Sequence, residues 1–325
     1  MNKLSSFTKN SRRGVFMVNF YTDLADERRE IYRKANQLDT EISGVDTEEE
    51  QINENIKTYR VKITNEEGAK AIQKPIGNYI TIDVKNLKIA EDEEIQQAAE
   101  VVTRELKALF DKHIDKQSDI LVVGLGNESV TPDSLGPKVV SQMDITRHLL
   151  KYAPQYLEPN ARPVSAIAPG VLGTTGIETA EVIKGVVDNV KPKLIIVIDS
   201  LASKSTERIS STIQIADTGI VPGAGVGNTR TEISENTFGI PVIAIGVPMV
   251  VDLRTIMNEG IDAFVTELQN KAQSNAYINN LKESGEYLKE TNEEQFNNMI
   301  VTPKEIDDLI NNMRDVISRG INFAF

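Results

Sequence analysis

Residues 120–127 are ILVVGLGN and residues 194–199 are LIIVID. Continuous apolar runs of this kind are typical of strands covered on both faces, as in the parallel sheets of α/β proteins. An aspartate follows each run: Asp133 lies in the segment TPDSLGP at residues 131–137, and Asp199 ends the second run directly. Because the carboxyl ends of parallel strands meet at one edge of a sheet, where sites commonly form, we expect both carboxylates in one crevice.

The rest of the pattern predicts the elements around these two strands. Alternating apolar and polar residues at 58–63 and 79–84 indicate a small antiparallel β element at about residues 58–90. Residues 302–305, TPKE, predict that Thr302 caps a final helix. The fold class we predict is α/β, a mainly parallel sheet flanked by helices, with that small antiparallel element. The other expected elements are core strands near 119–125, 163–168, 194–199, 210–216 and 241–247, and helices at about 24–38 and 92–110.

Composition restricts the chemistry. The chain has 325 residues, 40% of them hydrophobic, and no cysteine, which excludes disulfides, thiolate metal sites and cysteine nucleophiles. His113 and His148 are the only imidazoles. A net charge of −12 is poorly suited to binding nucleic acid, so we expect no direct contact with it. No apolar stretch reaches the roughly 20 residues that a membrane-spanning helix needs, so we expect no membrane partner and a cytoplasmic location.

Two carboxylates in one crevice can support hydrolysis without any other special residue. One ionised carboxylate can take a proton from water while its neutral neighbour protonates the group that is cleaved. An alternative is that Asp133 caps a helix and Asp199 simply ends a strand.

Other motifs compete with this interpretation. The segment GLGNES at 124–129 resembles a dinucleotide-binding loop, but Ser129 stands where the third glycine belongs. Together with TRH at 146–148, the same GLGN resembles peptidyl-tRNA hydrolases. The tripeptide DTG at 217–219 is that of pepsin-like proteases, which need a second copy, or a dimer that supplies it, and are almost entirely β.

A glycine-rich loop, PGAGVGN at 222–228, follows that tripeptide. It could let a peptide backbone approach closely, or it could be a long connector. The residues of this possible substrate loop are Gly223, Gly225, Gly227 and Asn228.

Several long motifs, in this order, resemble the germination protease family of endospore-forming bacteria. They are TDLA at 22–25, GLGN at 124–127, TPDSLGP at 131–137, PVSAIAPGV at 163–171, IDSLA at 198–202, GAGVGN at 223–228 and VTPKE at 301–305. The resemblance implies an endopeptidase that degrades small acid-soluble spore proteins in the forespore and spore core when a spore germinates. It also implies a fold similar to hydrogenase maturation proteases, a homotetramer, and Asp133 and Asp199 as the catalytic pair of an aspartic peptidase that uses no metal or other cofactor.

The resemblance also gives the N-terminal segment a role. The family is made as an inactive zymogen, and TDLADE at 22–27 is similar to the sites cut in its substrates, so we predict self-cleavage between Asp23 and Leu24. Residues 1–23 would then form a basic propeptide, since the first 13 residues carry four basic side chains and no acidic one. Residues 24–325 would form a single α/β peptidase domain that ends in a helical segment at about 269–325. The alternative for Thr22 and Asp23 is a helix cap.

Two rival functions stay open at this point. One is a nickel-dependent endopeptidase of the hydrogenase-maturation type that uses the same acids. The other is a protein that binds basic spore proteins without cutting them.

Overall fold

The computed structural model describes residues 22–110, 114–115, 117–158, 161–203, 205–223, 230–271, 280, 283–288 and 299–325. The strands are β1 Val45–Gln51, β2 Ile56–Ile63, β3 Gly77–Val84, β4 Ile120–Gly124, β5 Val164–Ile167, β6 Leu194–Ser203, β7 Thr212–Ala216, β8 Val242–Asp252 and β9 Ile300–Val301. The α-helices are α1 Ala25–Ala35, α2 Glu66–Ile72, α3 Asp92–Phe110, α4 Leu135–Val140, α5 Arg147–Tyr152, α6 Leu172–Thr175, α7 Thr179–Val190, α8 Glu235–Phe238, α9 Leu253–Lys271 and α11 Ile306–Asn322. The short 3-10 helices are η1 Leu87–Ile89, η2 Thr131–Asp133, η3 Pro154–Tyr156 and η4 Thr206–Arg208.

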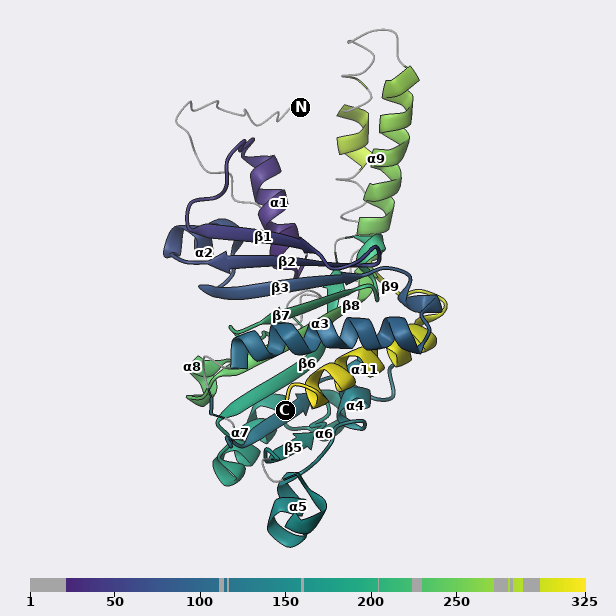
Figure 1. The fold of residues 1–325 in the computed structure, drawn as a ribbon. Helices are drawn as coiled ribbons and strands as arrows, with labels where there is room; N and C mark the ends of the chain where they lie inside the picture. The colour runs from purple at the N-terminus through teal and green to yellow at the C-terminus, as the bar shows by residue number, and fades with distance from the viewer. Residues whose placement is uncertain are drawn as a thin grey trace.

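All of the described strands belong to one sheet, in the order β1-β2-β3-β7-β8-β6-β4-β5, with β9 pairing to β8 (Figure 1). Strands β8, β6, β4 and β5 are parallel neighbours, which confirms the predicted α/β class and its parallel core. The antiparallel part is larger than the sequence indicated. It continues into the parallel core, because β7 pairs antiparallel with both β3 and β8.

Strand β1 was missed by the sequence analysis, because its acidic run is more typical of a polar connector. Across the ladder, Glu48 is the partner of Arg60, and Glu49 forms an ion pair with Lys57. The basic residues of β2 therefore compensate the acidic run, and charges of this kind are common on edge strands, where they discourage pairing with other chains.

The predicted cap of the last helix is wrong. Helix α11 begins at Ile306, and the hydroxyl of Thr302 donates a hydrogen bond of 3.0 Å to the carbonyl of Met249 in β8. Strand β9, just before Thr302, pairs with the end of β8. Pairing with the sheet thus uses the residues that the sequence pattern assigned to the helix cap.

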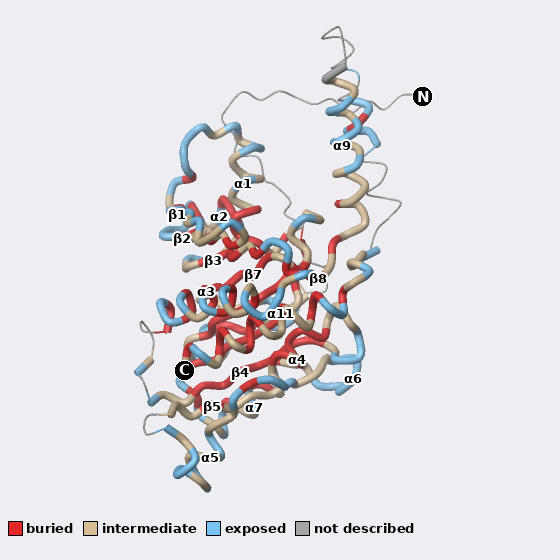
Figure 2. Tube along the Cα trace, turned by 45° about the vertical axis from the view of Figure 1, so that its right-hand side comes forward, coloured by how far each residue is buried: buried red, intermediate tan, exposed pale blue. Residues whose placement is uncertain are grey.

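Side chains of the central strands alternate between two apolar layers. Ile120 and Ile196 belong to the core cluster that includes α3 and α11, which lie together over one face of the sheet (Figure 1). Leu121 and Ile195 point to the other face, where α7 contributes Ile183. Figure 2 shows the buried residues concentrated in these strands, while α9 extends beyond them and is largely exposed or half-buried. Each fully buried isoleucine or leucine favours folding by about 1.5–3 kcal/mol.

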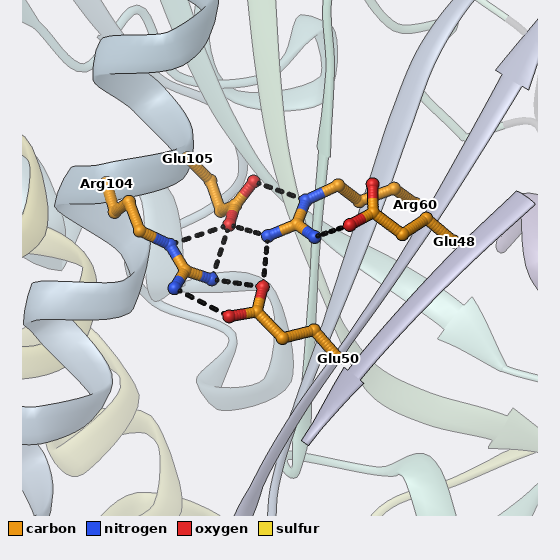
Figure 3. Close-up of polar contacts among 5 residues, drawn as sticks. All are labelled: Glu48, Glu50, Arg60, Arg104 and Glu105. Atoms are coloured by element: carbon orange, nitrogen blue, oxygen red, sulfur yellow. Dashed lines mark hydrogen bonds and ion pairs between the residues drawn. The ribbon is translucent and has the colours of Figure 1, made fainter. Parts of the chain in front are cut away.

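A cluster of charged side chains ties α3 to the antiparallel strands (Figure 3). Glu105 of α3 is buried, and its carboxylate accepts hydrogen bonds from Arg60 of β2 at 3.0 and 2.5 Å. Arg104 also donates to Glu105, and both arginines reach Glu50 of β1. The hydrogen bond to Glu105 is the largest of the effects that together raise the pKa of Arg60. Within the described ranges, no helix combines the length and apolarity that a membrane crossing requires.

We expect Arg60→Met to lower the free energy of unfolding by about 2–3 kcal/mol, because it leaves the buried carboxylate of Glu105 under-compensated. Urea denaturation at neutral pH measures the change. Arg104→Met is the matched control: Arg104 is half-exposed, and we expect a loss below about 1 kcal/mol. Equal losses in the two variants would contradict the special weight given to Arg60.

Candidate active site

The two predicted aspartates line one cleft of about 430 Å³. Asp199 lies within β6, and Asp133 ends η2, which follows β4. Strands β4 and β6 are parallel neighbours, and their pairing ends at Gly124 and Ile198, so Asp199 and Asp133 both lie just beyond the carboxyl end of β4. The predicted end of the second strand at Asp199 is wrong, because β6 continues to Ser203 along β8. The arrangement matches the crevice in which open α/β sheets form sites.

Asp133 is held by the turn that follows β4. The backbone N–H of Asn127 donates a hydrogen bond of 2.8 Å to Oδ2 of Asp133. Gly126 has a φ of +111°, and a Cβ atom there would lie 2.0 Å from the carbonyl oxygen of Asp133, so only glycine lets the turn pack this closely. Burial raises the pKa of Asp133, and the hydrogen bond from Asn127 partly opposes that shift.

Asp199 is more deeply buried, with 6% of its surface exposed. The N–H of Ser200 donates to its Oδ1 at 2.9 Å. Burial, and next the negative charge of Asp133, raise the pKa of Asp199 well above its ordinary value. A single proton shared by the two carboxyl groups therefore favours Asp199, which leaves Asp133 as the ionised partner.

The junction predicted to be cleaved lies at this cleft. Asp23 lines it together with both aspartates, and its charge contributes to the raised pKa of Asp199. Leu24 and Ala25 are fully buried, and α1 begins at Ala25. The Oγ1 atom of Thr22 accepts the N–H of Leu24 at 3.1 Å. The N-cap position of α1 is Leu24, with no side-chain cap hydrogen bond, so neither Thr22 nor Asp23 is the helix cap that the alternative predicted.

Two cationic side chains, Arg28 and Lys74, lie close enough to Asp23 to interact with its charge. Asp23 also lines a neighbouring cleft of about 300 Å³, to which Arg28 and Lys74 contribute. Burial, and next the charge of Arg28, lower the pKa of Lys74 to about 8, while Asp23 acts in the opposite direction. The second cleft thus offers positive charge to a carboxylate at the residue before the predicted scissile bond.

The acidic residues after the junction have cationic partners of their own. The guanidinium of Arg208, in η4, lies 2.6 Å from Asp26 and 3.4 Å from Glu27. The hydroxyl of Thr81 in β3 donates to Asp26 at 3.0 Å. Sequence reasoning missed Arg208, Lys74 and Thr81, because nothing in their neighbours distinguishes them from ordinary surface and strand residues.

The remaining candidates have different outcomes. Gly223 lines the cleft, whereas Gly225, Gly227 and Asn228 lie outside the described residues, as does His113. His148 is exposed on α5.

Asp217 has a structural partner. Its Oδ1 accepts the backbone N–H of Asn78 at 2.7 Å, which joins the end of β7 to the start of β3. Among the residues that the structure describes, no three His, Cys, Asp or Glu side chains form a group suited to a metal.

Comparison with known proteins identifies the relatives of this chain. The germination protease family model matches residues 22–295. A germination protease of Clostridium perfringens (strain SM101 / Type A) is 47% identical over 314 residues, covering 95% of each chain. One from Caldanaerobacter subterraneus subsp. tengcongensis is 49% identical over 316 residues, again with 95% of each chain covered. One from Geobacillus sp. (strain WCH70) is 40% identical over 351 residues.

Among solved structures, a NiFe hydrogenase maturation protease from Thermococcus kodakarensis KOD1 aligns with 45% of this chain and 80% of its own length. The sequence identity is 18% and the TM-score is 0.28, a likeness too weak to carry an argument about function.

The raised pKa values predict a specific dependence of stability on pH. Folding raises the pKa of both carboxyl groups, so the native state holds protons more tightly than the unfolded chain. Stability contributed by protonation is present near pH 4, the ordinary aspartate pKa, and is lost as the pH rises toward the raised native values. We therefore expect Asp199→Asn to melt at a higher temperature than the wild type at pH 7, with the difference vanishing near about pH 4.

Thermal melts of the mass-verified full-length chain across this pH range measure the effect. Asp188→Asn is the matched control, because Asp188 is 59% exposed on α7 and a surface substitution there should change stability by less than about 0.5 kcal/mol. If Asp199→Asn melts below the wild type at pH 7, the buried carboxylate is stabilising, which contradicts this account.

Proposed function

This chain belongs to the germination protease family, and from that membership we propose that it is an aspartic-type endopeptidase made as a self-processing zymogen. Membership of this family indicates a peptidase with a role in spore germination. The observation that carries the finer proposal is that Asp23, Asp133 and Asp199 line one cleft, which places the chain's own candidate substrate segment beside the two carboxylates.

In the proposed mechanism, a water molecule attacks the carbonyl carbon of Asp23. Asp133, the ionised partner, takes a proton from the water, and Asp199 gives its proton to the carbonyl oxygen. The tetrahedral intermediate then collapses and the C–N bond breaks. The nitrogen of Leu24 leaves as an amine after receiving the proton that Asp133 had taken, and the proton on the oxygen returns to Asp199 as the carboxyl product forms.

Cleavage of this bond would release residues 1–23 as a propeptide and leave residues 24–325 as the peptidase. The position of Asp23 in the cleft supports a blocked precursor, since the residue before the bond occupies space beside the pair. The acid preference on both sides of the bond is supported by Lys74 and Arg28 near Asp23, and by Arg208 near Asp26 and Glu27.

The proposed substrates are small acid-soluble spore proteins, degraded in the forespore and spore core during germination. A chain with net charge −12 attracts basic proteins over a distance, which suits substrates that bind DNA. The proposed assembly is a homotetramer, expected from the family resemblance and measurable by light scattering. We expect no direct contact with nucleic acid.

The test is intact mass spectrometry of the purified full-length chain held at mildly acidic pH. We expect the wild type to lose residues 1–23, and Asp133→Asn and Asp199→Asn to stay intact, because each variant removes one carboxyl group of the pair. The rate should fall as the pH rises, because ionisation of Asp199 removes the proton donor.

Asp217→Asn is the matched control, because Asp217 belongs to the DTG tripeptide and accepts a hydrogen bond from Asn78. We expect this variant to be processed like the wild type. Cleavage in all variants would assign the cut to another protease or other residues. A chelator should leave the rate unchanged, whereas loss of cleavage that nickel restores would favour a metal-dependent peptidase. Binding of basic spore proteins with no cleavage in any sample would favour the non-catalytic rival.

A further inference from the structure

A row of four residues crosses the sheet beside the cleft. Thr81 of β3 is the register partner of Gln214 of β7, Gln214 is the partner of Gly246 of β8, and Gly246 is the partner of Asp199 of β6. Directly paired residues project to the same face of a sheet. The neighbours of Gln214 along β7, Ile213 and Ile215, belong to the core under α3 and α11, so the row faces the opposite side.

Residues 23–26 run along this row. At one end Asp23 lies in the cleft with Asp199, and at the other end Asp26 accepts the hydroxyl of Thr81. Between them, the side-chain amide of Gln214 contacts the backbone on both sides of Leu24. Its Nε2 donates to the carbonyl oxygen of Asp23 at 3.1 Å, and its Oε1 accepts the N–H of Ala25 at 2.8 Å.

The orientation of this amide follows from its partners. The N–H of Ala25 can only donate and the carbonyl of Asp23 can only accept, so Oε1 must face the first and Nε2 the second. Gln214 is 6% exposed, and a buried amide group is costly unless both ends are bonded. A polar residue in the apolar strand segment TIQIA therefore has its hydrogen-bonding needs met by residues 23–25.

Gly246 stands between Gln214 and Asp199 in this row. Gly246 is on β8, which lies between β7 with Gln214 and β6 with Asp199. Neighbouring strands in a sheet lie about 4.8 Å apart. The side chain of Leu201 occupies the place of the missing side chain, since a Cβ atom at Gly246 would lie 2.4 Å from it.

We propose that Gln214 is the residue that aligns the peptide bond to be cut, by holding the carbonyl of the residue before the bond and the N–H of the second residue after it. This inference rests on the proposed cleavage between Asp23 and Leu24. The carbonyl oxygen that Nε2 contacts gains negative charge as water attacks, before the proton of Asp199 reaches it, so the same hydrogen bond strengthens in that step.

Both hydrogen bonds of Gln214 are with backbone atoms. They can therefore form with any peptide that lies in the same register, whatever its side chains. One restriction applies: the second residue after the cut must have an N–H group. A peptide with proline there cannot make the hydrogen bond to Oε1.

Self-cleavage of the full-length chain, followed by intact mass spectrometry, tests the role. Gln214→Met keeps the shape but removes both hydrogen bonds, and we expect cleavage to slow by about tenfold or more. Gln142→Met, at an exposed glutamine after α4, is the matched control and should cleave at the wild-type rate.

A double-mutant cycle separates alignment from mere structural support. Ala25→Pro removes the N–H that Oε1 accepts, and the backbone suits it: Ala25 is the first residue of α1, and Leu24 is extended, as a residue before proline must be. We expect Ala25→Pro to slow cleavage in the wild type but to add little in the Gln214→Met background. Additive losses would overturn the direct contact.

Gln214→Glu provides a second variant with a pH readout. An ionised carboxylate can still accept from Ala25 but cannot donate to the carbonyl of Asp23, whereas a protonated carboxyl group can. We therefore expect the ratio of its cleavage rate to that of the wild type to rise as the pH falls. A flat ratio would contradict a donor role and would remain informative if Gln214→Met fails to fold.

The outcomes distinguish this inference from the function on which it rests. Wild-type rates in Gln214→Met, with Asp133→Asn and Asp199→Asn inactive, would overturn the role of Gln214 alone. No cut between Asp23 and Leu24 in the wild type would overturn both proposals.

Discussion

The burial of Asp199 is the constraint on which the rest of the site depends. A carboxyl group within a central strand, covered by neighbouring chain and close to a second carboxylate, is costly to ionise. In the proposed mechanism, that cost separates the two aspartates into a proton donor and a base, although their residue types are identical. Local contacts hold the pair in this arrangement. Gly126 lets the turn after β4 approach Asp133, and the N–H groups of Asn127 and Ser200 donate hydrogen bonds to Asp133 and Asp199, respectively.

In the proposed function, the segment around the junction occupies space that a substrate would need, since Asp23 lines the cleft with both aspartates. Its contacts are asymmetric: Thr81 and Arg208 hold the residues that follow the bond, and those contacts join parts of the chain that a cut would leave connected. Residues 24–27 would therefore keep their partners after cleavage, while Asp23 would lose its covalent link to α1. If the bond is cut as proposed, a substrate entering from outside would have to compete with this retained segment. Displacement of residues 24–27 would then be a separate step after processing, distinct from hydrolysis itself.

Much of this arrangement could be predicted from local sequence, and the rest depended on contacts between distant segments. The apolar runs predicted β4 and β6, and parallel-sheet geometry then placed Asp133 and Asp199 at one edge. Strand β1 was not predicted, because its acidic residues are compensated by cations on β2, and a local sequence pattern does not reveal that pairing. The role of Gln214 depended on register across three strands, since only pairing through Gly246 aligns it with Asp199. A lone glutamine inside an apolar strand was the available signal, and it indicated a buried partner without identifying it.

Charge acts at two ranges in this protein, with opposite signs. The chain as a whole is strongly negative, so it draws basic proteins toward it, but such attraction is screened beyond about 8–10 Å at physiological salt and selects no particular bond. In the proposed function, selection would occur in the cleft, where Lys74 and Arg28 line the same space as the residue before the junction and Arg208 pairs with the acids after it. A basic substrate would then be attracted by the surface but positioned by its few acidic residues. The proposed backbone contacts of Gln214 would determine which peptide bond between those acids lies against the aspartates.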